Sequence, residues 1–174
     1  KVLIMDIGGG SVEFIISEGE TIYWSKSFPL GISILYNYFH KDDPISEEEL
    51  LKLTQFLDES LVDLMAILRV HNVNHLVGAS GTFDVLEDFL SDRSIKNKHA
   101  TTVSVAHVFP VLDEIIKKSL AQRLEYKEIP ETRAEMIVDA MVLIKFILTE
   151  GKFSSLTYSS FAMKEGILRK FMKG

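Results

Sequence analysis

The stretch KVLIMDIGGGSVEF, residues 1–14, is the part of the sequence from which the fold can be worked out. An almost continuous apolar run leads to Asp6, and three glycines and Ser11 follow. After them apolar residues alternate with others up to Ile16, a pattern typical of a β-strand. Two strands separated by glycines predict a β-hairpin, with a carboxylate where the first strand ends.

The glycines also have a chemical use. Gly8, Gly9 and Gly10 have no Cβ, so their backbone N–H groups can turn towards an anion such as phosphate. Ser11 adds a hydroxyl donor. A plain turn that only joins two strands explains the same spacing equally well, because glycine clusters mark turns more often than ligand sites.

Length and composition indicate one globular domain over residues 1–174, with 47% hydrophobic residues. The formal net charge of −6 argues against nucleic-acid or membrane-surface partners, which need clustered Lys and Arg. The absence of cysteine excludes disulfides and thiolate sites, and it fits a reducing, cytoplasmic location. No apolar run approaches the ~20 residues that span a bilayer.

The chain begins abruptly. It has no initiator Met, and Lys1 is followed at once by VLIM, a run typical of a strand buried on both faces. We therefore expect the chain to be part of a longer protein whose preceding half is missing. A processed terminus is the alternative.

The patterns after the hairpin alternate between strands and helices. Up to residue 90 we expect a strand at 21–30, helices at 32–39, 46–70 and 83–90, a polar connection at 40–44 and a strand at 75–78. The start of the long helix is the clearest signal, because Ser46 and Glu49 have the spacing of a capping box.

The second half continues in the same way. Beyond residue 90 we expect a surface loop at 91–102, a helix from Pro110 to about 118, a charged helix or loop at 119–128, an amphipathic helix at 131–151, a strand at 154–158 and a terminal helix at 163–172. The order predicts an α/β domain: a meander that continues into a mixed sheet of about five strands, with helices on its faces.

A second ligand-facing turn is predicted between the strand at 75–78 and the helix that follows. Ser80, Gly81 and Thr82 are small, and N–H groups at a helix N-terminus favour an anion. Capping of that helix by Ser80 or Thr82 is the alternative, and it is compatible with ligand binding.

Further along, Arg133 is a candidate for facing a ligand cleft, although most single Arg residues are solvated. Glu135 and Asp139 lie one helical turn apart, and we expect their shared face to hold water rather than a cation.

Three familiar motifs are absent from the sequence. Glu13 stands where the dinucleotide fingerprint needs its third glycine, and no Lys follows the glycines as in the Walker pattern. The nucleophile elbow GxSxG does not occur either.

Four segments together resemble one known family. DIGGGSVEF at 6–14, VGASGTFDVL at 77–86, TRAEMIVDAM at 132–141 and SFAMKEGIL at 160–168 are similar to the exopolyphosphatase and guanosine pentaphosphate phosphohydrolase family. That family belongs to the actin, Hsp70 and sugar kinase superfold. The resemblance implies a ribonuclease H-like, actin-like ATPase lobe, the second of two. The first lobe, with the family's catalytic glutamate, would then be absent from this chain.

The resemblance also implies roles for residues of the hairpin. Asp6 would sit beside a Mg²⁺ ion or the attacking water, the turn from Gly8 to Ser11 would cradle phosphates, and Glu13 would support that turn from behind. Val12 departs from the family's usual Thr, which removes one hydroxyl near the phosphate.

Later residues match the family in turn. Ser80, Gly81 and Thr82 match its second ligand-facing turn. Arg133 and Glu135 match an Arg and acidic pair, with Glu where Asp is usual, and Lys164 belongs to the closing motif.

The activity implied is hydrolysis of the terminal phosphate of inorganic polyphosphate or guanosine pentaphosphate, assisted by Mg²⁺ or another divalent cation. The partner is the N-terminal lobe of the full-length chain, and a homodimer through the surface exposed by truncation is a further expectation. This chain alone is expected to bind phosphate weakly and to hydrolyse nothing. The alternatives are an actin-like nucleotide-binding module that acts in ATP binding or assembly, and a non-catalytic interaction domain in which the glycines are only a turn.

Overall fold

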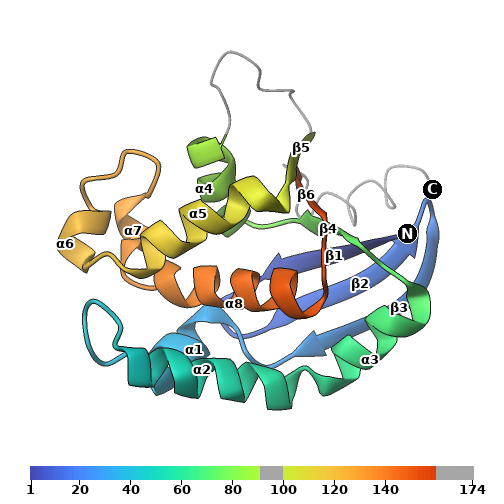
Figure 1. Ribbon diagram of the computed structural model, residues 1–174, viewed down its shortest axis with the longest axis horizontal. Helices are drawn as coiled ribbons and strands as arrows, with labels where there is room; N and C mark the ends of the chain where they lie inside the picture. The colour runs from blue at the N-terminus through green and yellow to red at the C-terminus, as the bar shows by residue number, and fades with distance from the viewer. Residues whose placement is uncertain (91–99, 160–174) are drawn as a thin grey trace, which may run out of the picture.

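A computed structural model describes residues 1–90 and 100–159, and it contains a six-stranded mixed sheet packed against helices (Figure 1). The strand order is β3-β2-β1-β4-β6-β5. β1 is parallel to β4, and β4 to β6, while the other neighbouring pairs are antiparallel. The strands are β1 Val2–Ile7, β2 Val12–Glu18, β3 Thr21–Phe28, β4 His75–Gly78, β5 Ala100–Ser104 and β6 Ser155–Ser159.

The predicted hairpin of β1 and β2 is confirmed. The two strands pair in antiparallel register from Val2 to Ile7, with Ile7 opposite Val12. Met5 and Ile7 are buried in the core, so Asp6 and its cross-strand partner Glu13 point to the opposite face of the sheet. The glycine turn, defined here as residues 8–11, joins the two strands.

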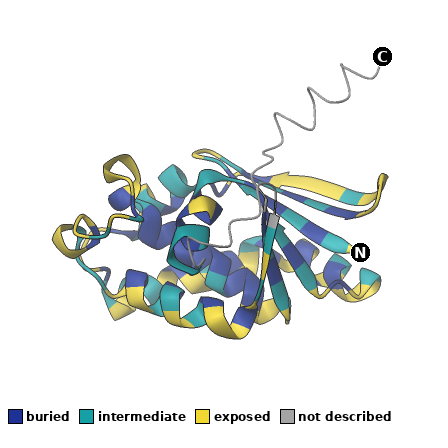
Figure 2. Cartoon of the chain, turned by 90° about the horizontal axis from the view of Figure 1, so that it is seen from above, coloured by how far each residue is buried: buried dark blue, intermediate teal, exposed yellow. Residues whose placement is uncertain are grey.

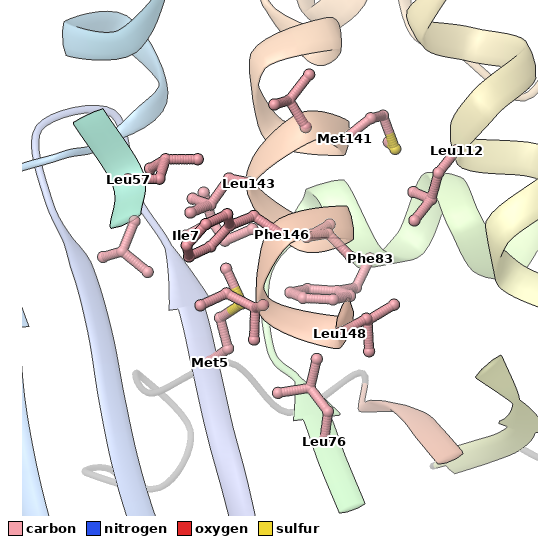
Figure 3. Packing of buried hydrophobic residues seen from close by; sticks show 14 of the residues in the cluster. Met5, Ile7, Leu57, Leu76, Phe83, Leu112, Met141, Leu143, Phe146 and Leu148 are labelled. Carbon is pink, nitrogen blue, oxygen red and sulfur yellow. The ribbon is translucent and has the colours of Figure 1, made fainter. Parts of the chain in front are cut away.

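The helix α8 lies at the centre of the core. Its residues are buried without interruption from Ile137 to Ile144 and again from Phe146 to Leu148. Figure 2 shows the buried residues concentrated between the helices and the sheet. In Figure 3, Phe146 of α8 lies beside Ile7 of β1. The helices are α1 Ile32–Phe39, α2 Glu47–Ser60, α3 Val62–His71, α4 Gly81–Leu90, α5 Val105–Ile116, α6 Leu120–Arg123, α7 Glu131–Ala134 and α8 Ile137–Glu150.

The long helix predicted over 46–70 is in fact two helices, α2 and α3, so that prediction is wrong. They meet at Leu61, whose φ of −107° and ψ of 15° depart from helical values. The hydrogen bonds on either side survive, because Leu61 N donates to Leu57 O and Met65 N donates to Leu61 O. Leu61 is fully buried. The break is therefore a local bend that keeps the apolar stripe on the core.

The start predicted for the helix at Pro110 is also wrong. α5 begins at Val105, and Pro110 lies inside it. Ser104 caps the helix, because its hydroxyl accepts a hydrogen bond from Ala106 N. The cap lies six residues before the proline, more than one helical turn, so the proline does not mark the first turn.

The surface loop predicted at 91–102 extends too far. Ala100–Ser104 pairs with β6 as a sixth strand, where about five were expected. Pairing with a strand this distant in sequence is not visible in a local pattern. Residues 91–99 lie outside the described part of the chain.

The amphipathic helix predicted at 131–151 is divided into α7 and α8, with Met136 between them at φ −99° and ψ 0°. The strand predicted at 154–158 is confirmed as β6. The terminal helix predicted at 163–172 falls outside the described residues. Within residues 1–90 and 100–159, no helix has the length and apolar character needed to cross a bilayer.

The capping box at the start of α2 forms as predicted, and it has a consequence for stability. The Glu49 carboxylate accepts hydrogen bonds from Ser46 N at 2.9 Å, Lys41 N at 2.6 Å and Asp42 N at 3.1 Å. Burial alone would raise the pKa of Glu49, but these hydrogen bonds outweigh it and lower the pKa to about 2.

We predict that Glu49→Gln removes a pH-dependent part of the stability. Because the pKa of Glu49 is lowered in the folded state, its carboxylate contributes fully to stability above the ordinary pKa of 4.5. That contribution is lost as the pH falls from 4.5 towards 2. In urea unfolding, the free energy of unfolding of the variant should be about 1 kcal/mol lower than that of the wild type at pH 7, and the difference should be smaller at pH 3. Equal losses at both pH values would contradict this account.

Candidate functional site

Three of the predicted segments meet at one cavity of about 270 Å³. Gly8 and Gly9 line it from the glycine turn, Gly81 and Thr82 from the start of α4, and Arg133 from α7. They meet because β1 and β4 are parallel neighbours, so the turns that follow these strands lie at the same edge of the sheet. A hydrogen bond of 2.9 Å from Ala79 N to Met5 O ties the second turn to β1.

The glycine turn is held through its carbonyl groups. Gly8 N donates to Ser11 O at 2.9 Å, which closes the turn. Gly8 O accepts from Ile32 N at 3.0 Å, and Gly9 O accepts from Ser33 N at 2.9 Å. The first turn of α1 therefore supplies the donors that fix the carbonyls.

The N–H groups of Gly9 and Gly10, unlike those carbonyls, are not held by backbone hydrogen bonds to other described residues. Both glycines are exposed, and neither N–H donates to another backbone group of residues 1–90 or 100–159. The carbonyl of Gly8 shares a peptide with the N–H of Gly9, so its bond to α1 polarises that N–H as a donor. The carbonyl of Gly9 acts in the same way on the N–H of Gly10. The turn thus has two polarised backbone donors without a backbone partner in residues 1–90 and 100–159.

The Ser11 hydroxyl has a different partner. Ser11 Oγ donates to Glu13 Oε1 at 2.5 Å, and Ser27 Oγ donates to the same oxygen at 2.7 Å. A hydroxyl has one proton, so in this arrangement Ser11 does not offer it to a ligand. Glu13 holds the end of the turn, and Asp6 lies opposite it across the hairpin, half-buried. Neither carboxylate is among the described residues that line the cavity.

The turn at residues 80–82 also consists of small residues, and one of its polar groups has no hydrogen-bond partner among the described residues. Ser80 precedes α4, and its carbonyl accepts a hydrogen bond of 2.9 Å from Phe83 N in the first turn of that helix. Its hydroxyl is buried and has no hydrogen-bond partner among the described residues, so it does not cap the helix. Thr82 is buried against the core and lines the cavity.

Arg133 reaches the cavity by passing directly over Gly81. A Cβ atom placed on Gly81 would lie 1.9 Å from an Nη atom of Arg133, so only glycine leaves room for the guanidinium. Arg133 is also the one charged residue among the described residues that line the cavity. A cation and the backbone of the glycine turn therefore face the same space.

Glu135 and Asp139 do not share a solvated face, so that prediction is wrong. Glu135 is exposed and accepts from Tyr36 Oη at 2.8 Å, a hydrogen bond that, with burial, raises the pKa of Tyr36. Asp139 is fully buried, 2.9 Å from His40 Nδ1. The break at Met136 separates the two acids, which a continuous helix would have aligned. His40, predicted in a polar connection, is buried as well.

Several residues around the site have no clear signal in the sequence. Ser33 and Thr132 line the cavity, and Thr132 is the neighbour of Arg133, which the sequence does indicate as a cleft residue. Arg123 is almost fully buried and donates to Ala134 O at 2.7 Å, and it lies 3.1 Å from Asp43 Oδ1. It anchors α7, which carries Arg133. A lone Arg in a charged segment gives no indication of such burial.

Lys164, the last of the predicted site residues, lies outside the described part of the chain.

Known proteins share both the sequence pattern and the fold. Residues 1–173 match the Ppx/GppA phosphatase family. The chain belongs to this family. The structure of an exopolyphosphatase from Cytophaga hutchinsonii is similar, with a TM-score of 0.91 and 32% identity, over 99% of this chain and 57% of that one.

Other relatives agree with this assignment. A Ppx/GppA family member from Aquifex aeolicus has the same fold, with a TM-score of 0.84 and 24% identity, over 99% of this chain and 56% of that one. A curated Haemophilus influenzae relative, which carries a provisional exopolyphosphatase name, is 22% identical over 99% of this chain and 53% of its own length. The chain thus has the family's actin-like ATPase fold and spans about half the length of these relatives.

We predict that Gly81→Ala displaces the Arg133 guanidinium and weakens anion binding without unfolding the protein. The added methyl meets the end of a flexible side chain, so the stability should change by less than about 1 kcal/mol. Titration with tripolyphosphate should show a weaker affinity for the variant. In an Arg133→Ala background the same change should have no further effect, and an additive effect there would contradict the prediction.

Proposed function

We propose that this chain is one lobe of a hydrolase that releases the terminal phosphate of inorganic polyphosphate or guanosine pentaphosphate. The observation that carries the proposal is the meeting of the glycine turn and Arg133 at one cavity. The family assignment supports a phosphatase of the exopolyphosphatase type.

The chemistry follows from the donors in the site. As a phosphoanhydride breaks, negative charge spreads over the oxygens of the transferred phosphoryl group. The N–H groups of Gly9 and Gly10 and the guanidinium of Arg133 would stabilise that charge, because they are already oriented before the reaction. The glycine turn and Arg133 would therefore bind the phosphates and lower the barrier to water attack.

The acidic side chains suit a hard cation. Mg²⁺ is usually held by one or two carboxylates together with substrate phosphates and water. Asp6 provides such a carboxylate at the end of β1, next to the turn. Asp6 would hold the ion, which supplies charge neutralisation at the phosphates when bound. Within the described residues, no three acidic or histidine side chains form a metal cluster by themselves.

The remaining machinery would come from a second lobe. The chain spans about half the length of its relatives, and the base that activates water is expected on the other half. This lobe alone should therefore bind phosphate weakly and release none from polyphosphate. Phosphate release by the purified 174-residue chain would contradict this division of labour.

A nucleotide-binding role is the second candidate. Ile32, Met136 and Ile137 give the same cavity an apolar side, which would suit a nucleoside ring. Tight ATP binding and filament formation by the full-length protein, without phosphate release from polyphosphate, would favour this candidate.

We predict that Gly9→Val in the full-length protein lowers phosphate release from polyphosphate by about 100-fold, the usual effect of losing an oriented backbone donor. A Cβ at position 9 already lies 3.4 Å from Ser33 Oγ, so the larger side chain would fill part of the cavity and shift the turn.

The assay measures phosphate release from polyphosphate and from guanosine pentaphosphate, with and without Mg²⁺. Val70→Ala, at a position that is 75% exposed, is the control and should leave the rate unchanged. If Gly9→Val kept the wild-type rate, the proposed role of the turn would be wrong.

A further inference from the structure

Gly31, just before α1, approaches the glycine turn more closely than a residue with a Cβ could. A Cβ atom placed on Gly31 would lie 2.4 Å from Ser11 N and 2.5 Å from the carbonyl carbons of Gly9 and Gly10. All three are backbone atoms of the turn, so no side-chain rotation relieves the overlap.

The backbone conformation of Gly31 does not itself require glycine. Its φ of −67° and ψ of 166° are open to any residue. Space is therefore the reason that glycine is needed here, and a substitution tests the close approach alone.

The helix that follows Gly31 is firmly anchored. Leu35 is fully buried, Tyr36 Oη donates to Glu135 at 2.8 Å, and the buried His40 lies 2.9 Å from Asp139. The glycine turn is less restrained at Gly10, where no atom of residues 1–90 or 100–159, its two chain neighbours aside, lies within 4 Å of an added Cβ. A side chain at position 31 would thus move the turn and not the helix.

We propose that Gly31 is a positioning residue for phosphate binding. By allowing α1 to approach, it lets Ile32 N and Ser33 N bond to the carbonyls of Gly8 and Gly9, which directs the N–H groups of Gly9 and Gly10 to the ligand. This inference rests on the proposed function, because it assumes that the turn binds phosphate.

The test compares Gly31→Ala with Gly151→Ala. A Cβ on Gly151 would lie 2.3 Å from the Phe153 ring and 2.8 Å from Ile147 O, and its φ of −76° is also unrestricted. Gly151 precedes β6, at the end of the parallel strands opposite the glycine turn. It is therefore a crowded glycine remote from the site.

The measurement is a titration of the ¹⁵N-labelled protein with tripolyphosphate and Mg²⁺, after circular dichroism has shown that each variant is folded. The wild type and Gly151→Ala should show the same affinity. Gly31→Ala should bind at least about tenfold more weakly, because the loss of even one hydrogen bond to a charged group has an effect of about that size. The amide signals of Gly9 and Gly10 should no longer respond.

A second pair of variants covers the case in which Gly31→Ala does not fold. Ile32→Pro removes the N–H that bonds to Gly8 O, at the first helical position, where proline is tolerated. Ile32→Val alters the same side chain but keeps that N–H, so the comparison between the two variants isolates the hydrogen bond. Weaker binding by the proline variant than by the valine variant supports the inference.

Two results would overturn it, and they are distinguishable. Equal tripolyphosphate affinity for wild type and a folded Gly31→Ala, or for both Ile32 variants, would show that Gly31 does not position the turn. No binding by the wild type would overturn the proposed function, and this inference with it.

Discussion

The parallel pairing of β1 with β4 is the constraint on which the site depends. It places the glycine turn and the turn at 80–82 at one edge of the sheet, although about seventy residues separate them in the sequence. The hydrogen bond from Ala79 N to Met5 O continues this pairing beyond the strands. Without that register the two turns would not line a common cavity.

The site concentrates positive character in an acidic protein. The chain has a net charge of −6, so long-range attraction of a polyanion is weak, and in the proposed function local donors would have to hold it. Backbone N–H groups would do so without the desolvation of a buried lysine. Arg133 adds one charge, held in place by its passage over Gly81 and by the anchoring of α7 through Arg123.

Local patterns predicted the elements that depend on neighbours in sequence. The hairpin, the capping box of Ser46 and Glu49, and the strand–turn–helix unit around Ser80 all follow from residues within a few positions of one another. Other features depend on contacts between distant segments, and no local pattern indicates them. They are the strand β5, the burial of Arg123 and the pairing of His40 with Asp139. Within the site, the glycines are evident from the sequence, but the direction of their N–H groups depends on α1. Residue type thus limits the chemistry that is possible, while packing decides which residues line the cavity.

A crystal structure grown with tripolyphosphate and Mg²⁺ tests the central claim most directly. The account predicts a phosphate oxygen about 3 Å from the nitrogens of Gly9 and Gly10, with the Arg133 guanidinium on the same phosphate chain. An anion bound elsewhere on the chain, with these N–H groups turned to protein atoms, would contradict it.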